Sequence, residues 1–195
     1  MSVDWVVIGL GNPGLEYHRT RHNSGADAVA LLADRHGGAL RRDGRIKVLA
    51  DTVRVGQHRI LLGFPQTYYN ESGVAVGALL RRHHLEPERL VVVHDELDLP
   101  PGRIKVKFGG GLAGNRGLAS IKAHLGTDEF ARVRIGVGKP PGRQQGADHV
   151  LRRPGKAERT ELDVTIEEAA DAVETLLADG IDTAMQRFNA RAESD

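Results

Sequence analysis

Short segments with the pattern of β-strands alternate along this chain with segments in which apolar residues recur at helical spacing. Residues 90–93 (Leu-Val-Val-Val) form a continuous apolar run, which is typical of a central strand covered on both faces. Residues 45–55 and 58–64 flank Gly56-Gln57 and predict a β-hairpin. The other predicted strands span residues 3–9, 103–108 and 132–138.

The helical segments share an apolar stripe with a period of three to four residues. They are expected around residues 26–33, 70–80, 118–125, 162–177 and 181–188. In the first of them the apolar face is marked by Ala26, Val29, Ala30 and Ala33. Neither a repeat nor a linker divides the chain. The sequence therefore predicts a single α/β domain over residues 1–195, with a twisted mixed β-sheet flanked by helices on both faces.

The composition excludes several classes of protein. The chain has 195 residues and no cysteine, which excludes a disulfide scaffold, a thiolate zinc site and a cysteine nucleophile. No run approaches ~18 consecutive apolar residues, so no transmembrane helix is expected. The N-terminus lacks the basic and apolar regions of a signal peptide. We therefore expect a cytoplasmic protein with no membrane partner.

Charge is distributed unevenly, although the formal net charge is only +1. Residues 102–143 contain nine Lys or Arg against two acidic residues, whereas residues 157–195 contain eleven Asp or Glu against three Arg. Such an asymmetry indicates that a polyanion docks on one face only. Two independently solvated surfaces are the alternative that charge alone leaves open.

Residues 9–14 (GLGNPG) match the G-x-G-x-x-G fingerprint of dinucleotide-binding proteins directly after a predicted strand. That site needs a helix that begins at the loop, so that free backbone N–H groups meet the pyrophosphate. Here Pro13 lacks an N–H, and residues 15–25 precede the first helical periodicity. The loop is therefore interpreted as one that aims a side chain, with Asn12 as the candidate. A nicotinamide or flavin nucleotide site is the weaker alternative.

Polar side chains collect after two of the predicted strands. Asn12 and His22 follow the first strand, and Asp95 follows the apolar run of residues 90–93. Active sites of open α/β sheets lie at the carboxyl ends of strands, so His22 and Asp95 would meet if these strands are neighbours. A carboxylate behind an imidazole fixes its tautomer and stabilises the imidazolium, which makes the pair a general base.

The same residues argue against a protein nucleophile and against a metal. No serine lies in a G-x-S-x-G elbow and cysteine is absent, so water is the expected attacking group. His18 and His22 are spaced i,i+4, but no H-E-x-x-H motif or third ligand accompanies them, and we expect no metal.

Four motifs resemble the signatures of the bacterial peptidyl-tRNA hydrolase family. They are GLGNPG at residues 9–14 with Tyr17 and TRHN at 20–23, QTYYNESG at 66–73, HDELDLPPG at 94–102 with Lys105, Lys107 and three glycines at 109–111, and RVRIGVG at 132–138. Several long motifs in one order are far more specific than a single short pattern. The resemblance covers nearly the whole chain. It implies an enzyme that hydrolyses the ester bond between an N-acylated amino acid and tRNA, and so recycles the tRNA.

The family's roles carry over to the matching positions of this chain. His22 would deprotonate water, Asp95 would hold it in its basic form, and Asn12 would help to place the ester. The resemblance implies that the peptide and the 3′-terminal nucleotide are contacted by Tyr17, Tyr68 and Asn70. It also implies that tRNA phosphate is clamped by Lys105, Lys107 and Arg134. The resemblance further implies a monomer without metal or cofactor, whose partner is peptidyl-tRNA, bound at its acceptor stem and 3′ end.

One loop departs from the family pattern. After the three glycines the family reads Gly-Gly-His-Asn-Gly, whereas residues 113–117 read Ala-Gly-Asn-Arg-Gly, so Asn115 takes the place of the histidine and Arg116 that of the substrate-binding asparagine. Three accounts stay open: Asn115 substitutes through a shift of the loop, Arg116 adds a phosphate contact, or catalysis is weakened. The last account corresponds to the alternative function, a catalytically weak RNA-binding relative of the same fold that resembles splicing factors.

Overall fold

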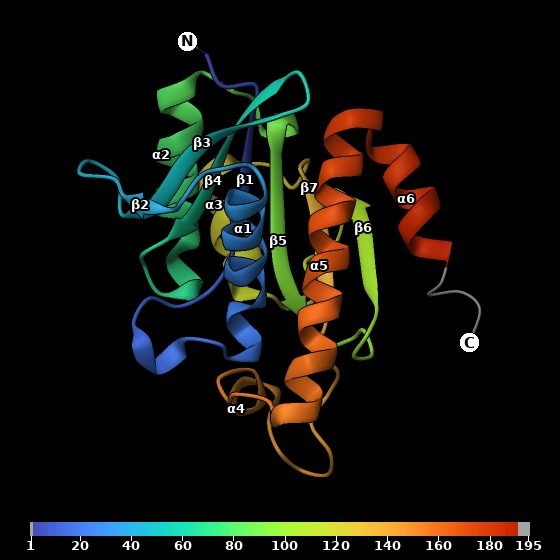
Figure 1. Cartoon of the computed structure of the whole chain (residues 1–195). Helices are drawn as coiled ribbons and strands as arrows, with labels where there is room; N and C mark the ends of the chain where they lie inside the picture. The colour runs from blue at the N-terminus through green and yellow to red at the C-terminus, as the bar shows by residue number, and fades with distance from the viewer. Residues whose placement is uncertain (1, 191–195) are drawn as a thin grey trace.

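The computed structural model describes residues 2–190, which form a seven-stranded sheet in the order β2-β3-β4-β1-β5-β7-β6 (Figure 1). The strands are β1 (Trp5–Gly9), β2 (Arg41–Arg42), β3 (Val48–Val55), β4 (His58–Pro65), β5 (Leu90–Glu96), β6 (Ile104–Phe108) and β7 (Ala131–Gly136). Strands β4, β1, β5 and β7 run parallel, while β3 and β6 run antiparallel to their neighbours β4 and β7. The sheet is therefore mixed, and β1 and β5 are direct neighbours at its centre.

Helices cover both faces of this sheet. They are α1 (Ser24–Arg35), α2 (Ser72–His83), α3 (Arg116–Leu125), α4 (Gly146–Val150), α5 (Lys156–Asp179) and α6 (Ile181–Asn189), with short 3₁₀ helices η1 (Leu15–Tyr17), η2 (Arg21–Asn23), η3 (Tyr69–Glu71) and η4 (Pro87–Arg89). Helices α1 and α5 pack on one face and α2 and α3 on the other, and each pair closes a separate buried apolar cluster (Figure 1). A helix with the length and hydropathy of a membrane span is absent from residues 2–190.

The predicted fold class is confirmed, with three local differences. Strand β5 does not end at Val93 but runs on to Glu96, and all seven of its residues are buried, so Asp95 lies within the strand. Ala30 is exposed, because the buried stripe of α1 runs through Ala28, Val29 and Leu32 instead. The elements β2 and α4 are too short to show a period, and the sequence does not predict them.

A close backbone approach fixes the place where α1 begins. Gly25 lies in the first turn of α1, and a Cβ there would lie 2.1 Å from the carbonyl oxygen of Val93 on β5. A Cβ on Gly9, the last residue of β1, would lie 2.1 Å from the carbonyl oxygen of Gly25. Helix α1 therefore starts directly over the carboxyl end of β1 and the middle of β5, and η2, which precedes it, is held near the carboxyl end of β5.

We expect Gly25→Ala to destabilise the fold, although Gly to Ala inside a helix ordinarily stabilises it. The added methyl group cannot be accommodated without moving α1 away from the sheet, and the free energy of unfolding should fall by about 3 kcal/mol or more. Urea unfolding measures this change. Gly44→Ala is the matched control, because a Cβ on Gly44 meets no atom within 4 Å, and its effect should stay within about 0.5 kcal/mol. Equal stability of the two variants would refute the close approach.

Candidate active site

A cavity of about 530 Å³ opens at the carboxyl ends of β1 and β5. Its polar lining comes from the loop after β1, from η2 and η3, from β5 and from the residue that precedes α3, and consists mainly of Asn12, His22, Tyr68, Asn70, Asp95 and Asn115. Leu97, Val150 and Leu151 supply an apolar wall. With Arg116, which also lines it, the cavity brings seven predicted site residues together from segments that are far apart in the sequence.

The predicted contact between His22 and Asp95 is confirmed, although 73 positions separate the two residues. The Nδ1 atom of His22 lies 2.8 Å from Oδ2 of Asp95. The Asp95 carboxylate is buried, whereas the His22 side chain is 18% exposed and borders the cavity. With Nδ1 protonated and donating to the carboxylate, the basic nitrogen of the imidazole is Nε2.

Tyr69 contacts both members of this pair, and sequence reasoning missed it. Its ring stacks on the His22 ring with 3.5 Å between the centroids and 10° between the planes. Its hydroxyl donates to Oδ1 of Asp95 at 2.8 Å. Burial and the neighbouring charge of Asp95 raise the pKa of the Tyr69 phenol well above its ordinary value, so the hydroxyl keeps its proton. The sequence points instead to Tyr68, whose side chain is largely exposed at the cavity.

Asn12 is locked in place by two neighbours. Asn23, at the end of η2, accepts the backbone N–H of Asn12 at 2.9 Å and donates its side-chain amide to the Asn12 carbonyl at 2.9 Å. The side-chain oxygen of Asn12 accepts the backbone N–H of Tyr69 at 2.7 Å. The glycine-rich loop therefore does aim the Asn12 side chain, as predicted. The helix that a dinucleotide would need begins only at Ser24.

The loop that departs from the family pattern is also tied to this cavity. Asn115 caps the N-terminus of α3, because its side-chain oxygen accepts the backbone N–H of Leu118 at 2.9 Å. Its side-chain nitrogen donates to the Tyr69 hydroxyl at 2.8 Å. Arg116, the first residue of α3, is exposed and lines the cavity as well. Asn115 and Arg116 therefore both face the site. Asn115 is bonded to Tyr69, whereas Arg116 is exposed at the cavity.

His94, next to Asp95 on β5, does not line the cavity. It is fully buried, and its Nδ1 lies 2.7 Å from the backbone carbonyl oxygen of Asp95. Burial lowers the pKa of His94 to about 4, so the ring is neutral near pH 7. Its position is structural, whereas Glu96 does line the cavity and pairs with Arg134 at 3.6 Å.

The predicted phosphate clamp lies beside the cavity and not in its lining. Lys105 on β6 pairs in register with Arg134 on β7, and Lys107 pairs with Arg132. The side chain of Arg134 is only 12% exposed and faces Glu96, which leaves Lys105 and Lys107 as the more accessible cations. Burial, followed by the charges of Arg134, Arg132 and Lys105, lowers the pKa of Lys107, which indicates that these cations are close together.

Arg132 corrects the sequence-based picture of this basic segment. From sequence alone, Arg132 is counted among the cations of a basic surface, yet its side chain is fully buried. Its guanidinium donates to the carbonyl oxygens of Gly109, Gly110 and Gly111 and of Asp128, at 2.9–3.2 Å. Arg132 therefore holds the glycine loop instead of meeting solvent. Nothing in the alternation of basic and apolar residues distinguishes it from its neighbours.

Tyr17, predicted to contact substrate, lies neither in the cavity lining nor among the cations of the predicted phosphate clamp. It is the last residue of η1, is partly buried and is not among the residues that line the cavity. Within residues 2–190, no group of three or more His, Cys, Asp or Glu side chains is placed to hold a metal ion.

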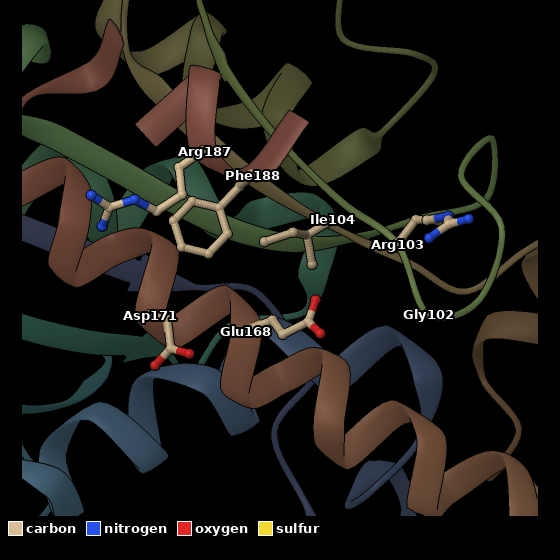
Figure 2. A pocket seen from close by; sticks show the side chains of 7 residues that line it. All are labelled: Gly102, Arg103, Ile104, Glu168, Asp171, Arg187 and Phe188. Atoms are coloured by element: carbon tan, nitrogen blue, oxygen red, sulfur yellow. The ribbon is translucent and has the colours of Figure 1, made fainter. Parts of the chain in front are cut away.

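A second cavity, of about 300 Å³, lies between β6, α5 and α6 (Figure 2). Its lining residues, labelled in Figure 2, are Gly102, Arg103, Ile104, Glu168, Asp171, Arg187 and Phe188. The charges in this lining are mixed, and Asp171 is already paired with Arg35 at 2.8 Å. The lining contains neither a histidine nor a side-chain amide, so we place the candidate active site in the first cavity.

Comparisons with known proteins agree with this arrangement. A family model described as peptidyl-tRNA hydrolase matches residues 6–195. Among curated proteins, the chain is 45% identical to a peptidyl-tRNA hydrolase of Cutibacterium acnes, over 97% of this chain and 100% of that protein. It is 44% identical to a peptidyl-tRNA hydrolase of a Mycobacterium species, over 98% of this chain and 100% of that protein.

Solved structures give the same match. The peptidyl-tRNA hydrolase of Acinetobacter baumannii superposes with a TM-score of 0.90 at 35% sequence identity, covering 97% of each chain. A peptidyl-tRNA hydrolase in complex with N-propanol also gives a TM-score of 0.90, at 36% identity over 95% of this chain and 94% of that one.

The buried neutral His94 predicts a loss of stability on acidification. The folded protein keeps His94 neutral down to about pH 4, whereas the unfolded chain takes up a proton below its ordinary pKa of 6.5. The unfolded state therefore binds more protons between these values, and about 3 kcal/mol of stability should be lost as the pH falls from 6.5 to 4. Urea unfolding of wild type and His94→Asn at both pH values measures this contribution. Parallel pH dependences of the two proteins would contradict it.

Proposed function

Because the chain belongs to the peptidyl-tRNA hydrolase family, we propose that His22 is the general base with which it hydrolyses the ester bond between peptide and tRNA. The observation that carries the proposal is the 2.8 Å contact between His22 Nδ1 and Asp95 Oδ2, beside a cavity whose lining contains no second histidine. In this proposal Asp95 orients the imidazole and stabilises its charged form.

The reaction proceeds by direct attack of water. Nε2 of His22 takes a proton from a water molecule while the water oxygen attacks the ester carbonyl carbon. The carboxylate of Asp95 stabilises the imidazolium that forms. When the tetrahedral intermediate collapses, the ester oxygen of the terminal ribose leaves and receives a proton from the imidazolium. An ester has a better leaving group than an amide, so no covalent intermediate on the protein is needed.

Asn12 is assigned to the developing negative charge. Its side-chain oxygen is used by the Tyr69 backbone N–H, so the side-chain nitrogen is the group that faces substrate. A fixed amide donor is worth most where charge appears in the transition state. The same nitrogen can also donate to the carbonyl oxygen of the substrate's N-acyl group. A free ammonium would leave such a buried group mismatched, at a cost of ~1–3 kcal/mol, which favours N-acylated substrates.

The remaining lining residues are assigned to the two ends of the substrate. Asn70 is exposed at the cavity, and Tyr68 is 59% exposed there, so both can contact the peptide and the 3′-terminal nucleotide. Tyr17 is assigned to the same contacts from outside the cavity. Arg116 is assigned to a phosphate near the 3′ end, because a cation at a helix N-terminus is disfavoured unless a negative group offsets it.

Lys105, Lys107 and Arg134 are assigned to phosphates of the tRNA acceptor stem. The three residues lie on neighbouring strands of one sheet edge, beside a catalytic pair that acts at the 3′ end. Lysine and arginine bind phosphate without reading base sequence, which suits an enzyme that acts on many tRNAs.

We propose that the chain is one domain and acts as a monomer, because its own helices cover both faces of the sheet. We propose a cytoplasmic location, because peptidyl-tRNA arises during translation. The alternative of a catalytically weak RNA-binding relative gains no support, since the similar proteins are named as hydrolases.

His22→Ala should lower kcat by at least ~10²–10⁴-fold, the usual contribution of acid–base catalysis, with little change in tRNA affinity. Release of N-acylated amino acid from tRNA measures turnover, and filter binding measures affinity. His18→Ala is the matched control, because His18 is an exposed imidazole four positions away that does not line the cavity. It should keep wild-type turnover. Normal turnover in His22→Ala would remove His22 from the mechanism.

Lys107→Ala should weaken tRNA binding and reduce the slope of log K against log salt by about one phosphate contact. The exposed Lys47, which precedes β3 near the other edge of the sheet, provides the control Lys47→Ala. Titrations at several salt concentrations compare the two variants. Identical slopes for wild type and Lys107→Ala would refute the contact.

A further inference from the structure

We propose that Tyr69, held by Asn115, is a positioning residue for hydrolysis, which fixes the His22 ring and the Asp95 carboxylate in one arrangement. The inference rests on the proposed role of His22 as the general base. Tyr69 has no role among those that the family motifs imply. The inference also gives a function to Asn115, the first residue of the altered Asn115-Arg116 pair.

The Tyr69 side chain contacts both members of the pair. The Tyr69 ring lies parallel to the His22 ring, 3.5 Å away, and so restricts rotation of the imidazole out of that plane. The Tyr69 hydroxyl bonds Oδ1 of Asp95 at 2.8 Å, while His22 bonds Oδ2 at 2.8 Å. The carboxylate is thus held at both oxygens, and its plane is fixed relative to the imidazole.

Asn115 sets the direction of the hydroxyl proton. Its side-chain oxygen is occupied by the backbone N–H of Leu118, so the nitrogen must face the Tyr69 oxygen, which it approaches to 2.8 Å. An amide nitrogen can only donate. The phenol oxygen therefore accepts from Asn115, and its own proton points to Asp95. The chain of donors runs Asn115 to Tyr69 to Asp95, and it continues to His22 through the other carboxylate oxygen.

This chain has an electrostatic consequence for the base. A hydrogen bond to Oδ1 withdraws negative charge from the carboxylate and weakens its hold on an imidazolium. Without the hydroxyl, the full charge of the Asp95 carboxylate would act on the imidazolium that forms during the reaction. Tyr69 therefore affects both the geometry of the pair and the pH range in which it works.

Tyr69→Phe tests the hydroxyl while keeping the ring. We expect kcat to fall roughly 10- to 100-fold, as for the loss of a hydrogen bond to a charged group. The KM should change by no more than about threefold. The acidic limb of the kcat–pH profile should move toward higher pH. Tyr69→Leu, which also removes the stacked ring, should lower kcat further.

Asn115→Ser tests the other end of the chain without removing the helix cap, because serine is itself a good N-cap residue. It should shift the acidic limb in the same direction as Tyr69→Phe, by a smaller amount. Since Asn115 acts through the hydroxyl, the double variant Tyr69→Phe with Asn115→Ser should lose no more kcat than Tyr69→Phe alone.

Ser72→Ala is the matched structural control. Its hydroxyl donates to the backbone carbonyl of Tyr69 at 2.6 Å, so the variant loosens the same segment without touching Asp95 or His22. Its acidic limb should stay at the wild-type position, even if its unfolding midpoint falls as far as that of Tyr69→Phe. A shift in Ser72→Ala equal to that in Tyr69→Phe would overturn the inference.

The outcomes separate this inference from the proposed function. Wild-type kcat and pH profile in Tyr69→Phe, together with an inactive His22→Ala, would refute the role of Tyr69 and leave His22 as the base. Full turnover in His22→Ala would refute both. Additive losses of kcat in the double variant would show that Asn115 and Tyr69 act independently, which contradicts the chain of donors.

Discussion

The contact of the first turn of α1 with the carboxyl end of β1 and the middle of β5 is the constraint on which the site depends. Gly9 and Gly25 permit it, since a side chain at either position would overlap a backbone carbonyl group. The approach fixes the height of η2 above the sheet. It thereby places an imidazole from one segment against a carboxylate from another, 73 positions away. The relative positions of His22 and Asp95 therefore depend on this backbone packing.

The polar groups around the cavity form one hydrogen-bonded network. Asn23 fixes Asn12, Asn12 receives the Tyr69 backbone, and Tyr69 and His22 share the two oxygens of Asp95. Buried polar atoms are costly unless paired, so such a network has few alternative arrangements. That rigidity suits the proposed direct attack of water, because a water molecule has no covalent attachment to hold it in line. Lys105 and Lys107 lie outside this network, so the phosphate contacts proposed for them would leave His22 and Asp95 undisturbed.

Much of this arrangement follows from sequence, and the parts that do not have physical reasons. The apolar run at residues 90–93 identifies the central strand, and the rule that sites lie at strand ends predicts that His22 meets Asp95. Tyr69 is not predicted, because a buried aromatic residue beside an exposed one carries no periodic signal. Arg132 is misread as a surface cation because burial depends on the glycine loop that folds over it. Asn115 could be flagged as a departure, but its bond to Tyr69 depends on the distance between α3 and η3, which no local pattern encodes.

In the proposed mechanism Asp95 holds His22 as the tautomer with its proton on Nδ1, so that Nε2 is the free base. Nitrogen-15 chemical shifts of labelled His22 test this directly, compared between wild type and Asp95→Asn at neutral pH. The account predicts a hydrogen-bonded Nδ1–H and an unprotonated Nε2 in wild type, and a loss of that preference in Asp95→Asn. A proton on Nε2 in the neutral wild-type ring, or the same tautomer distribution in both proteins, would contradict it.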